Sequence, residues 1–350
     1  MLNESLLKEL SEASGVPGHE ASLRAIVRRE LTGVVDSMEV DAMGNLIATK
    51  KGKGQKKLMI AAHMDEIGFI VKFIDPRGFI TLQPLGGFDP RQLFAQRMHI
   101  HGYAGEVLPG VMTYHTKPAH MLSADEAKQA PSMDKFFVDV GLSAEAVAEK
   151  VRIGDMVTLD RNAERCGENF IGKCLDNRVG VFVMLEAMKA LGDHEFDIYA
   201  VATTQEEIGL RGATTAAYAI DPDVGIALDT TLCCDGPGFP DAEAVTRLGD
   251  GVGIKIMDGS MLSHPRLVDF CREIATRDSI THQMEVLPRG GTDGGAIQRA
   301  RGGNVCITLS VPTRYIHTVN EMVSVTDVQA TINLLTTVLQ EAHSADFTLA

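Results

Sequence analysis

The fold is decided by one short stretch of the chain, Lys57-Leu58-Met59-Ile60-Ala61-Ala62-His63-Met64-Asp65. Its first seven residues are almost continuously apolar, which is typical of a strand that is buried on both faces, as the strands of parallel sheets are. In an open α/β sheet the ligand crevice lies beyond the carboxyl ends of the strands. The stretch therefore predicts a central strand and, where His63 and Asp65 end it, one corner of a functional site.

Helical and strand patterns alternate on both sides of this stretch. Before it we expect helices at Glu4 to Ala13 and Glu20 to Leu31, and strands at Ser37 to Asp41 and Leu46 to Lys50. From Asp176 onward we expect helices at Asn177 to Ala190, Gly209 to Ala219, Pro265 to Arg277 and Thr326 to His343, and strands at Phe196 to Thr203, Val224 to Leu228 and Asn304 to Ser310. Such alternation predicts an α/β fold with a doubly wound, mostly parallel sheet and helices on both faces.

The segment between residues 70 and 164 has a different pattern. It alternates apolar and polar residues in short runs that are separated by Gly and Pro, as in Gly78-Phe79-Ile80-Thr81-Leu82, and it holds one helical stretch, Ser143 to Lys150. This pattern is typical of antiparallel strands. We therefore predict a small β-barrel-like domain at 70–164, inserted into a catalytic domain that is formed by residues 1–69 and 165–350.

Composition and charge argue against several classes of protein, namely nucleic-acid-binding, secreted and membrane-spanning proteins. The formal net charge is −14, with 47 acidic and 33 basic residues, which argues against nucleic acid as a partner because phosphate binding needs clustered Lys and Arg. The N-terminal residues lack the pattern of a secretory signal, and the chain has no apolar run of about 18 residues that could span a membrane. The six cysteines show no Cys-x-x-Cys spacing. These features predict a cytoplasmic protein with reduced thiols.

Residues that can bind metal ions follow the predicted strands where these end. His63 and Asp65 follow the first strand, Glu206 and Glu207 follow the strand that ends near Thr203, and Asp229 follows the strand at 224–228. The last strand runs into a loop that reaches His317, and Asp176 opens a predicted helix. Each residue alone has an ordinary explanation, such as a helix N-cap or a hydrogen-bonded core histidine. Together, so many carboxylates and imidazoles on one sheet edge would repel unless cations neutralised them.

This set of ligand types suits two divalent ions of Zn, Co or Mn, and it lacks the thiolates of a structural zinc site. One aspartate, most naturally Asp176, can bridge two ions, and the water between them then becomes acidic. Asp65 can hold the imidazole of His63 in one tautomer. Of Glu206 and Glu207, one can bind metal and the other can act as the general base; the residue pattern does not choose between them.

Two further motifs contain residues that could form sites. Gly290-Gly291-Thr292-Asp293-Gly294-Gly295 is interpreted as a glycine-rich turn that forms a pocket wall close to the substrate backbone, with Gly291, Thr292 and Asp293 as substrate-binding candidates. His99 and His101 share one face of a strand but have no carboxylate spaced nearby, so an ordinary strand is the better interpretation.

Over essentially its whole length the chain resembles the cocatalytic metallo-aminopeptidases of the tetrahedral type, a family that includes glutamyl aminopeptidases and FrvX-type proteins, some with older endoglucanase labels. The resemblance rests on segments that occur in the family's order: Ser14-Gly15-Val16-Pro17-Gly18-His19-Glu20, Asp41-Ala42-Met43-Gly44-Asn45-Leu46, Ala62-His63-Met64-Asp65-Glu66-Ile67-Gly68, Gly172-Lys173-Cys174-Leu175-Asp176-Asn177-Arg178, Gln205-Glu206-Glu207-Ile208-Gly209-Leu210-Arg211-Gly212-Ala213, Asp229-Thr230, Gly290-Gly291-Thr292-Asp293-Gly294-Gly295 and Ile316-His317-Thr318.

The resemblance implies a role for each site residue. Asp176 would bridge the two metal ions, Glu207 and His317 would complete one site, and His63 and Asp229 would complete the other. Glu206 would be the general base and Asp65 the orienting acid. The chain departs from the family at Asn177, where relatives frequently carry a second aspartate, and we expect this change to alter metal affinity without loss of activity.

The function that follows is hydrolysis of N-terminal residues from short peptides. The resemblance also implies that the inserted β domain mediates dimerisation and that the dimers build a hollow dodecamer. One alternative is a metal-dependent deacylase of N-acyl amino acids or peptides. A second is a glycoside hydrolase, because Glu206 with Glu207 or Asp229 could serve as a carboxylate pair.

Overall fold

The computed structural model describes residues 2–117 and 119–349, which form two compact units. One unit holds the described residues up to 66, residues 162–316 and the chain from 320 on, and the other holds 67–161 together with 317–319. The insertion expected at 70–164 overlaps the second unit at residues 70–161. The bounds differ at the C-terminal end because the strand that begins at Glu164 pairs with the sheet of the first unit, and at the N-terminal end because the strand that begins at Gly68 belongs to the second unit.

Four parallel strands form the centre of the large sheet in the first unit. They lie in the order β12 (Asp197–Thr203), β3 (Lys57–His63), β13 (Val224–Leu232) and β16 (Val305–Arg314). Nearly every residue of β3 is buried, as its apolar run predicts. Because Thr203 pairs with His63 and Ala227 pairs with Ala61, the carboxyl ends of these strands lie at the same edge.

Shorter strands extend this sheet on both sides. On one side β2 (Leu46–Lys50) pairs antiparallel with β12, and β1 (Ser37–Val40) pairs with β2. On the other side lie β17 (Glu321–Ser324), β11 (Asn169–Gly172) and β10 (Glu164–Cys166), while β14 (Val252–Met257) and β15 (His282–Val286) branch from β16. The prediction missed these five strands. Four of them have five residues or fewer, but β14 carries the alternating apolar residues Val252, Ile254 and Ile256 and could have been recognised.

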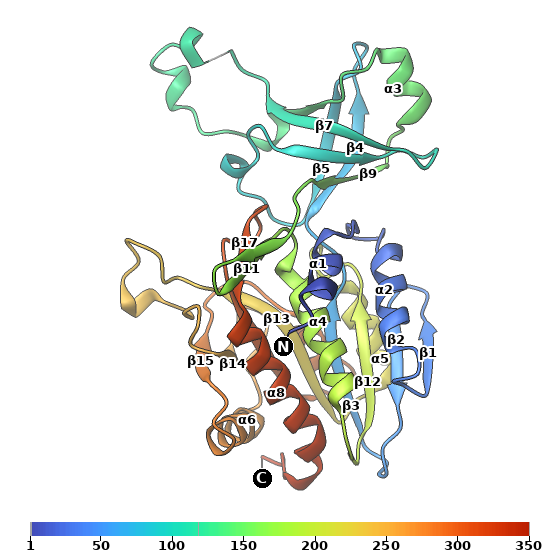
Figure 1. The fold of residues 1–350 in the computed structure, drawn as a ribbon, viewed down its shortest axis with the longest axis vertical. Coiled ribbons are helices and arrows are strands. Elements are labelled where there is room, and N and C mark those ends of the chain that lie inside the picture. The colour runs from blue at the N-terminus through green and yellow to red at the C-terminus, as the bar shows by residue number, and fades with distance from the viewer. Residues whose placement is uncertain (1, 118, 350) are drawn as a thin grey trace. The chain divides into compact units, whose positions relative to one another are not determined.

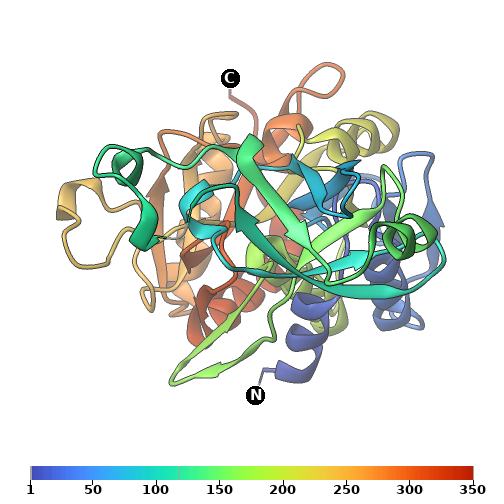
Figure 2. The ribbon, with the colours of Figure 1, turned by 90° about the horizontal axis from the view of Figure 1, so that it is seen from above.

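Helices cover both faces of the sheet. One face packs against α1 (Glu4–Glu12), α2 (Ala21–Leu31), α4 (Leu175–Ala190), α6 (Pro265–Arg277) and α8 (Val325–Glu341), and the other against α5 (Arg211–Ile220) and α7 (Asp293–Gln298). In Figure 1 the helices α4 and α8 lie in front of β3 and β13. Seen from above, α5 lies on the opposite side of the sheet from α8 (Figure 2). The predicted doubly wound α/β fold is confirmed.

The interpretation of residues 290–295 as a turn was wrong for the second half of that motif, because α7 begins at Asp293. A Cβ atom at Gly294 would lie 2.6 Å from Met261 Sδ, and one at Gly295 would lie 2.3 Å from Ser260 Oγ. The two glycines therefore allow this helix to pack closely on the chain around Ser260. Close packing within the protein, and not approach of a substrate, explains why they are small.

The second unit is a closed antiparallel barrel with the strand order β4 (Gly68–Ile74), β5 (Ile80–Leu85), β8 (Phe136–Asp139), β7 (Val107–Tyr114), β6 (Arg97–His101) and β9 (Met156–Leu159). Its core is a separate apolar cluster that includes Phe69, Ile100 and Val138. The helix predicted at Ser143 to Lys150 is α3 (Ala144–Lys150), which begins after a capping hydrogen bond from Ala146 N–H to Ser143 Oγ. The predicted barrel-like domain is thus confirmed.

In the described part of the chain, six short 3-10 helices connect these elements: η1 (Pro90–Gln92), η2 (Ala119–Met121), η3 (Glu126–Lys128), η4 (Met133–Lys135), η5 (Asp241–Glu243) and η6 (Ala342–Ser344). Among the described residues, no helix is both long enough and apolar enough to cross a membrane.

Candidate metal centre

The site lies where β3, β12 and β13 present their carboxyl ends. His63 is the last residue of β3 and is 2 % exposed, and Asp229 lies near the end of β13 and is 6 % exposed. Glu206 and Glu207 belong to the turn that joins β12 to α5. The parallel register of the three strands brings these four side chains to one place, as the sequence predicts.

The Nε2 atom of His63 faces three carboxylates. It lies 3.4 Å from Asp176 Oδ1, 3.8 Å from Asp229 Oδ1 and 3.9 Å from Glu206 Oε2. Ligand atoms that bind one metal ion are separated by such distances, since each lies about 2.0 to 2.2 Å from the ion. His63 with Asp176 and Asp229 forms one group that could hold a metal ion, and His63 with Glu206 and Glu207 forms another.

Asp176 reaches the site through an interruption of its helix. The sequence predicted that it would open a helix, and α4 does begin beside it at Leu175, but the backbone of Asp176 and Asn177 is not helical. Cys174 precedes them in the left-handed conformation, with φ 57°. The main-chain N–H of Asp176 donates to Glu321 Oε2 at 2.8 Å. This local geometry fixes the main chain of Asp176 independently of α4.

Asn177 is completely buried and hydrogen-bonded. Its Nδ2 atom donates to the main-chain oxygen of Leu228 at 2.7 Å, and its Oδ1 atom accepts from Gly180 N–H at 3.1 Å. A carboxylate could not donate the first of these hydrogen bonds. Asn177 therefore links the start of α4 to β13 immediately before Asp229.

Burial and mutual repulsion disfavour negative charge in the metal-free site. Burial raises the pKa of Glu206 well above its usual value, and the carboxylates of Asp229, Glu207 and Asp293 raise it further. Burial likewise raises the pKa of Asp229, with Asp176 and Asp293 adding to the effect. Burial would lower the pKa of His63, yet the surrounding carboxylates raise it well above its usual value. Buried carboxylates this close together need cations to be ionised, so the donor set fits metal ions.

Asp65 contacts both His63 and the turn that carries the two glutamates. His63 Nδ1 lies 3.0 Å from the main-chain oxygen of Asp65 and 3.6 Å from its Oδ1 atom. The two carboxylate oxygens of Asp65 accept hydrogen bonds from the main-chain N–H groups of Glu206 and Glu207, at 3.0 and 3.1 Å. The sequence predicted the proximity to His63 but not the contact with the turn.

The three predicted substrate-binding residues differ in exposure. Gly291 is exposed, whereas Thr292 and Asp293 are each 2 % exposed. Thr292 Oγ1 donates to Asp258 Oδ2 at 3.0 Å. Asp293 Oδ2 accepts from Thr203 Oγ1 at 2.5 Å, and burial raises the pKa of Asp293 to about 6. Thr292 and Asp293 thus belong to the buried hydrogen-bond network beneath the site.

His317 follows β16 by three residues and belongs to the short segment His317–Val319 that is grouped with the second unit. Ile316 and Asn320, which flank that segment, belong to the first unit. Within the second unit, a Cβ atom at Gly87 would lie 3.5 Å from the Nδ1 atom of His317.

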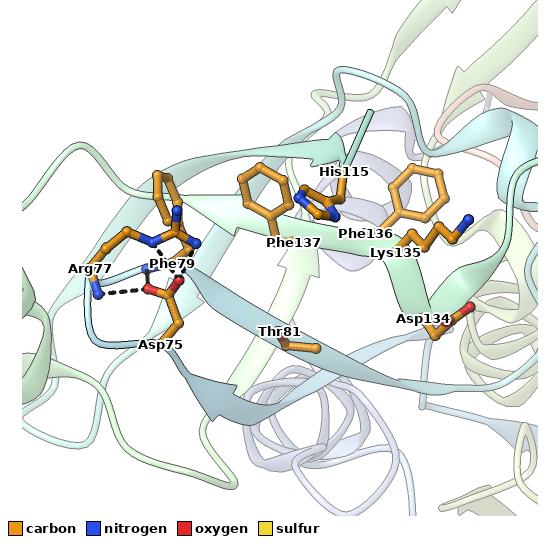
Figure 3. Close-up of a pocket in the computed structure, with 9 residues that line it drawn as sticks. All are labelled: Asp75, Arg77, Phe79, Thr81, His115, Asp134, Lys135, Phe136 and Phe137. Carbon is orange, nitrogen blue, oxygen red and sulfur yellow. Dashed lines mark hydrogen bonds and ion pairs between the residues drawn. The ribbon is translucent and has the colours of Figure 1, made fainter. Parts of the chain in front are cut away.

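A separate pocket of about 410 Å³ lies on the β unit (Figure 3). It is lined by Asp75, Arg77, Phe79, Thr81, His115, Asp134, Lys135, Phe136 and Phe137. Asp75 forms an ion pair with Arg77 at 2.7 Å, and the rings of Phe79 and Phe137 pack edge to face. The metal-competent groups found among the described residues do not include any of these side chains.

Comparison with known proteins agrees with this geometry. A model of the M42 glutamyl aminopeptidase family matches residues 44–334. The lysyl aminopeptidase of Pyrococcus furiosus is 38 % identical over 355 residues, which cover 99 % of this chain and 100 % of that protein.

Solved structures with the same fold include aminopeptidases of two archaea. The TET aminopeptidase from a marine sediment archaeon, Thaumarchaeota archaeon SCGC AB-539-E09, superposes with a TM-score of 0.93 at 33 % identity and covers 96 % of this chain and 95 % of its own. The Pyrococcus horikoshii TET1 peptidase, which can assemble into a tetrahedron or a large octahedral shell, has a TM-score of 0.86 at 30 % identity and covers 97 % of this chain and 99 % of its own.

Proposed function

The chain belongs to the M42 glutamyl aminopeptidase family, and from that premise we propose that it holds two divalent metal ions through His63, Asp176, Glu207, Asp229 and His317. Membership establishes a metal-dependent aminopeptidase, a hydrolase of peptides. The number of ions, the choice among Zn, Co and Mn, and the ligand set are our proposal. The observation that carries it is the position of His63 Nε2 within 3.9 Å of three carboxylates.

We assign His63 and Asp229 to one ion, Glu207 and His317 to the other, and Asp176 to both. The distances from His63 to Asp176 and Asp229 support the first assignment. His317 is proposed because the chain leaves β16 at the same edge of the sheet before reaching it, and its imidazole with the carboxylates of Asp176 and Glu207 makes a suitable donor set.

When bound, the ions would polarise the carbonyl of the scissile peptide bond and lower the pKa of a water molecule toward neutrality. Glu206 then accepts the proton of the attacking water and returns it to the leaving amine. The position of Glu206 supports this role because its Oε2 atom lies 3.9 Å from His63 Nε2, beside the proposed metal ligands. The acidic surroundings also suit a substrate with a free, positively charged N-terminal amine. Gly291, the exposed member of its motif, is the proposed contact with the substrate backbone, which Thr292 and Asp293 support from beneath.

The metal requirement is tested by dialysing the protein against a chelator and measuring hydrolysis of aminoacyl anilides. We expect activity to be lost and to return when Zn, Co or Mn is added. Full activity after chelation, with metal absent by elemental analysis, would rule out the proposed chemistry.

The role of Glu206 is tested by Glu206→Gln, which we expect to lower kcat by about 10²-fold or more because loss of a general base has that effect. Metal content should stay unchanged. Glu186→Gln, on the surface of α4 where it pairs with Lys189, is the matched control and should keep its activity.

The alternatives make different predictions. A deacylase of N-acyl substrates would hydrolyse acetylated peptides and not free ones, so a parallel assay of both substrates separates it from an aminopeptidase. The glycosidase alternative gains no support from the family, whose relatives reported above are aminopeptidases.

We also propose that the chain forms homo-oligomers, that the β unit mediates dimerisation and that the dimers build a dodecamer in the cytoplasm. The tetrahedral assembly of the Pyrococcus horikoshii relative supports this architecture, and the free cysteines fit a reducing compartment. Light scattering coupled to size-exclusion chromatography tests it directly. A monomeric mass at micromolar protein concentration would contradict it.

A further inference from the structure

The turn that carries Glu206 and Glu207 is held by side chains from three distant parts of the chain. Four successive main-chain N–H groups, those of residues 204–207, each donate to a side-chain oxygen. Thr204 donates to Asn45 Oδ1 at 3.0 Å and Gln205 donates to Glu20 Oε1 at 3.2 Å. Glu206 and Glu207 donate to the two carboxylate oxygens of Asp65.

The three acceptor residues are buried, so loss of one of these hydrogen bonds would leave a buried polar group unpaired. Asn45 and Asp65 are 0 % exposed and Glu20 is 1 % exposed. Burying a carboxylate is costly unless hydrogen bonds satisfy it. Glu20 Oε1 accepts from both Gln205 N–H and Gly18 N–H, the latter at 2.7 Å. The Glu20 carboxylate therefore links Gly18, which precedes α2, to Gln205, which follows β12.

The backbone of the turn needs such support. Gln205 has φ 56°, in the left-handed region that residues other than glycine rarely adopt. Such a conformation persists only where the surrounding structure determines it. The next two residues carry the proposed base and a proposed metal ligand, so a rotation at Gln205 would redirect both carboxylates.

We propose that Glu20, together with Asn45 and Asp65, forms a clamp that positions the main chain of residues 204–207 and thereby fixes the direction of the Glu206 and Glu207 side chains. Glu20 is a positioning residue in this proposal, because it acts through the turn and does not touch substrate. In this clamp Asp65 positions the turn in addition to contacting His63. The proposal rests on the roles assigned above to Glu206 and Glu207.

Glu20 is the best residue to test because its carboxylate accepts hydrogen bonds from the main-chain N–H groups of Gly18 and Gln205 and not from a proposed ligand side chain. Glu20→Gln keeps an oxygen that can accept both hydrogen bonds, whereas Glu20→Met has similar length and no such acceptor. We expect kcat for an aminoacyl anilide to stay within about threefold of wild type in Glu20→Gln and to fall about 10- to 100-fold in Glu20→Met, because a displacement of about 1 Å at a reacting group can cost 10²-fold. KM should change little. Metal content should stay near that of wild type in Glu20→Gln and fall in Glu20→Met, because the turn also carries Glu207, a proposed metal ligand.

Asp327 provides the matched control for loss of a buried carboxylate. It is 0 % exposed and accepts main-chain N–H groups from Gly249 and Gly251, at 2.7 and 2.9 Å, in a different part of the first unit. Asp327→Met should lower thermal stability but leave kcat per folded, metal-loaded chain unchanged. If Glu20→Met does not fold, Glu20→Asp keeps the charge but shortens the reach by one methylene, and it should lower kcat by about 10-fold.

Three results would overturn the clamp: a folded Glu20→Met enzyme with wild-type kcat, equal losses in the Met and Gln variants, or a Glu20→Asp enzyme with wild-type kcat. Glu206→Gln in the same assay separates this failure from a failure of the proposed function. If Glu206→Gln is inactive while Glu20→Met is fully active, the clamp is wrong and the role of Glu206 stands. If Glu206→Gln is active, the assigned role of Glu206 is wrong.

Discussion

The Nδ1 atom of His63 lies 3.0 Å from the main-chain oxygen of Asp65. A carbonyl oxygen can only accept a hydrogen bond, so Nδ1 carries a proton and Nε2 is the nitrogen that would bind a metal ion once it is deprotonated. That atom faces Asp176, Asp229 and Glu206. The tautomer that a metal ligand needs is thus fixed by the main chain, two residues beyond His63.

Replacing His63 should reduce metal binding. His63→Gln removes the nitrogen ligand and should lower the metal content by about one ion per chain and kcat by about 10²-fold or more, measured by elemental analysis and by hydrolysis of aminoacyl anilides. His99→Gln is the control, since His99 lies on β6 of the other unit. Wild-type metal content in His63→Gln would contradict the ligand assignment.

The metal-free protein should become less stable as pH rises. Glu206, Asp229 and Asp293 have raised pKa values, so above their unfolded pKa values, near 4, the native state binds more protons than the unfolded chain and its stability falls through the native pKa values. For Asp293 this window extends to about 6. The raised pKa of His63 acts in the same direction, because its stabilising contribution is present below pH 6.5 and is lost as pH rises through its native value.

Thermal unfolding from pH 5 to 8, with and without metal, tests this prediction. We expect Tm of the metal-free protein to fall across the range and the gain in Tm on adding zinc to grow, because bound metal displaces protons. A gain in Tm that shrinks with rising pH would show that the carboxylates are already ionised without metal.

Removing Lys173 should destabilise the protein strongly. Its ammonium group lies 2.5 Å from Glu66 Oε2, and both side chains are at most 3 % exposed. Lys173→Met leaves the Glu66 carboxylate buried with less compensation, which typically costs about 3 to 5 kcal/mol of unfolding free energy. The loss of unfolding free energy should be smaller than this, because the guanidinium group of Arg178 also lies 3.5 Å from Glu66 Oε1 and compensates part of its charge. Urea denaturation measures the change, and Lys8→Met, at an exposed pair with Glu12, should change stability by less than about 1 kcal/mol.

Enlarging Gly294 should also reduce stability. An added Cβ atom would lie 2.6 Å from Met261 Sδ and 2.7 Å from Thr308 Oγ1, both in buried residues. Gly294→Ala should therefore cost about 1 to 3 kcal/mol, as overpacking usually does. Gly302→Ala is the control because nothing lies within 4 Å of the atom it would add. Equal stability of the two variants would show that α7 can move away without cost.

Hydrophobic periodicity predicted the large sheet, its principal helices and the β unit. The strand at Lys57–His63 is nearly all buried and could be recognised from its composition alone. The helix α7 could not, since its first three residues are Asp293, Gly294 and Gly295, which have poor helix propensity. Tertiary packing of Gly294 and Gly295 against Met261 and Ser260 decides its conformation.

The candidate metal ligands were proposed from strand ends and residue chemistry, and the structure brings His63, Asp176 and Asp229 together. The contacts of Glu20 and Asn45 could not be predicted in this way, because their partners are main-chain N–H groups 185 and 159 residues away. Every residue except proline has a main-chain N–H group, so the sequence does not show which of these groups will donate to a given side chain. The same holds for Asp65, whose carboxylate binds the turn at residues 206 and 207.

The closed barrel of the β unit limits how this part of the chain can associate with other molecules. Each of its six strands pairs with a neighbour on both sides, from β4 round to β9. Addition of a strand from another chain requires an open edge with unpaired main-chain groups, and closure removes such edges. Recognition by the six strands of this unit must therefore depend on the shape and chemistry of their side chains and not on main-chain pairing.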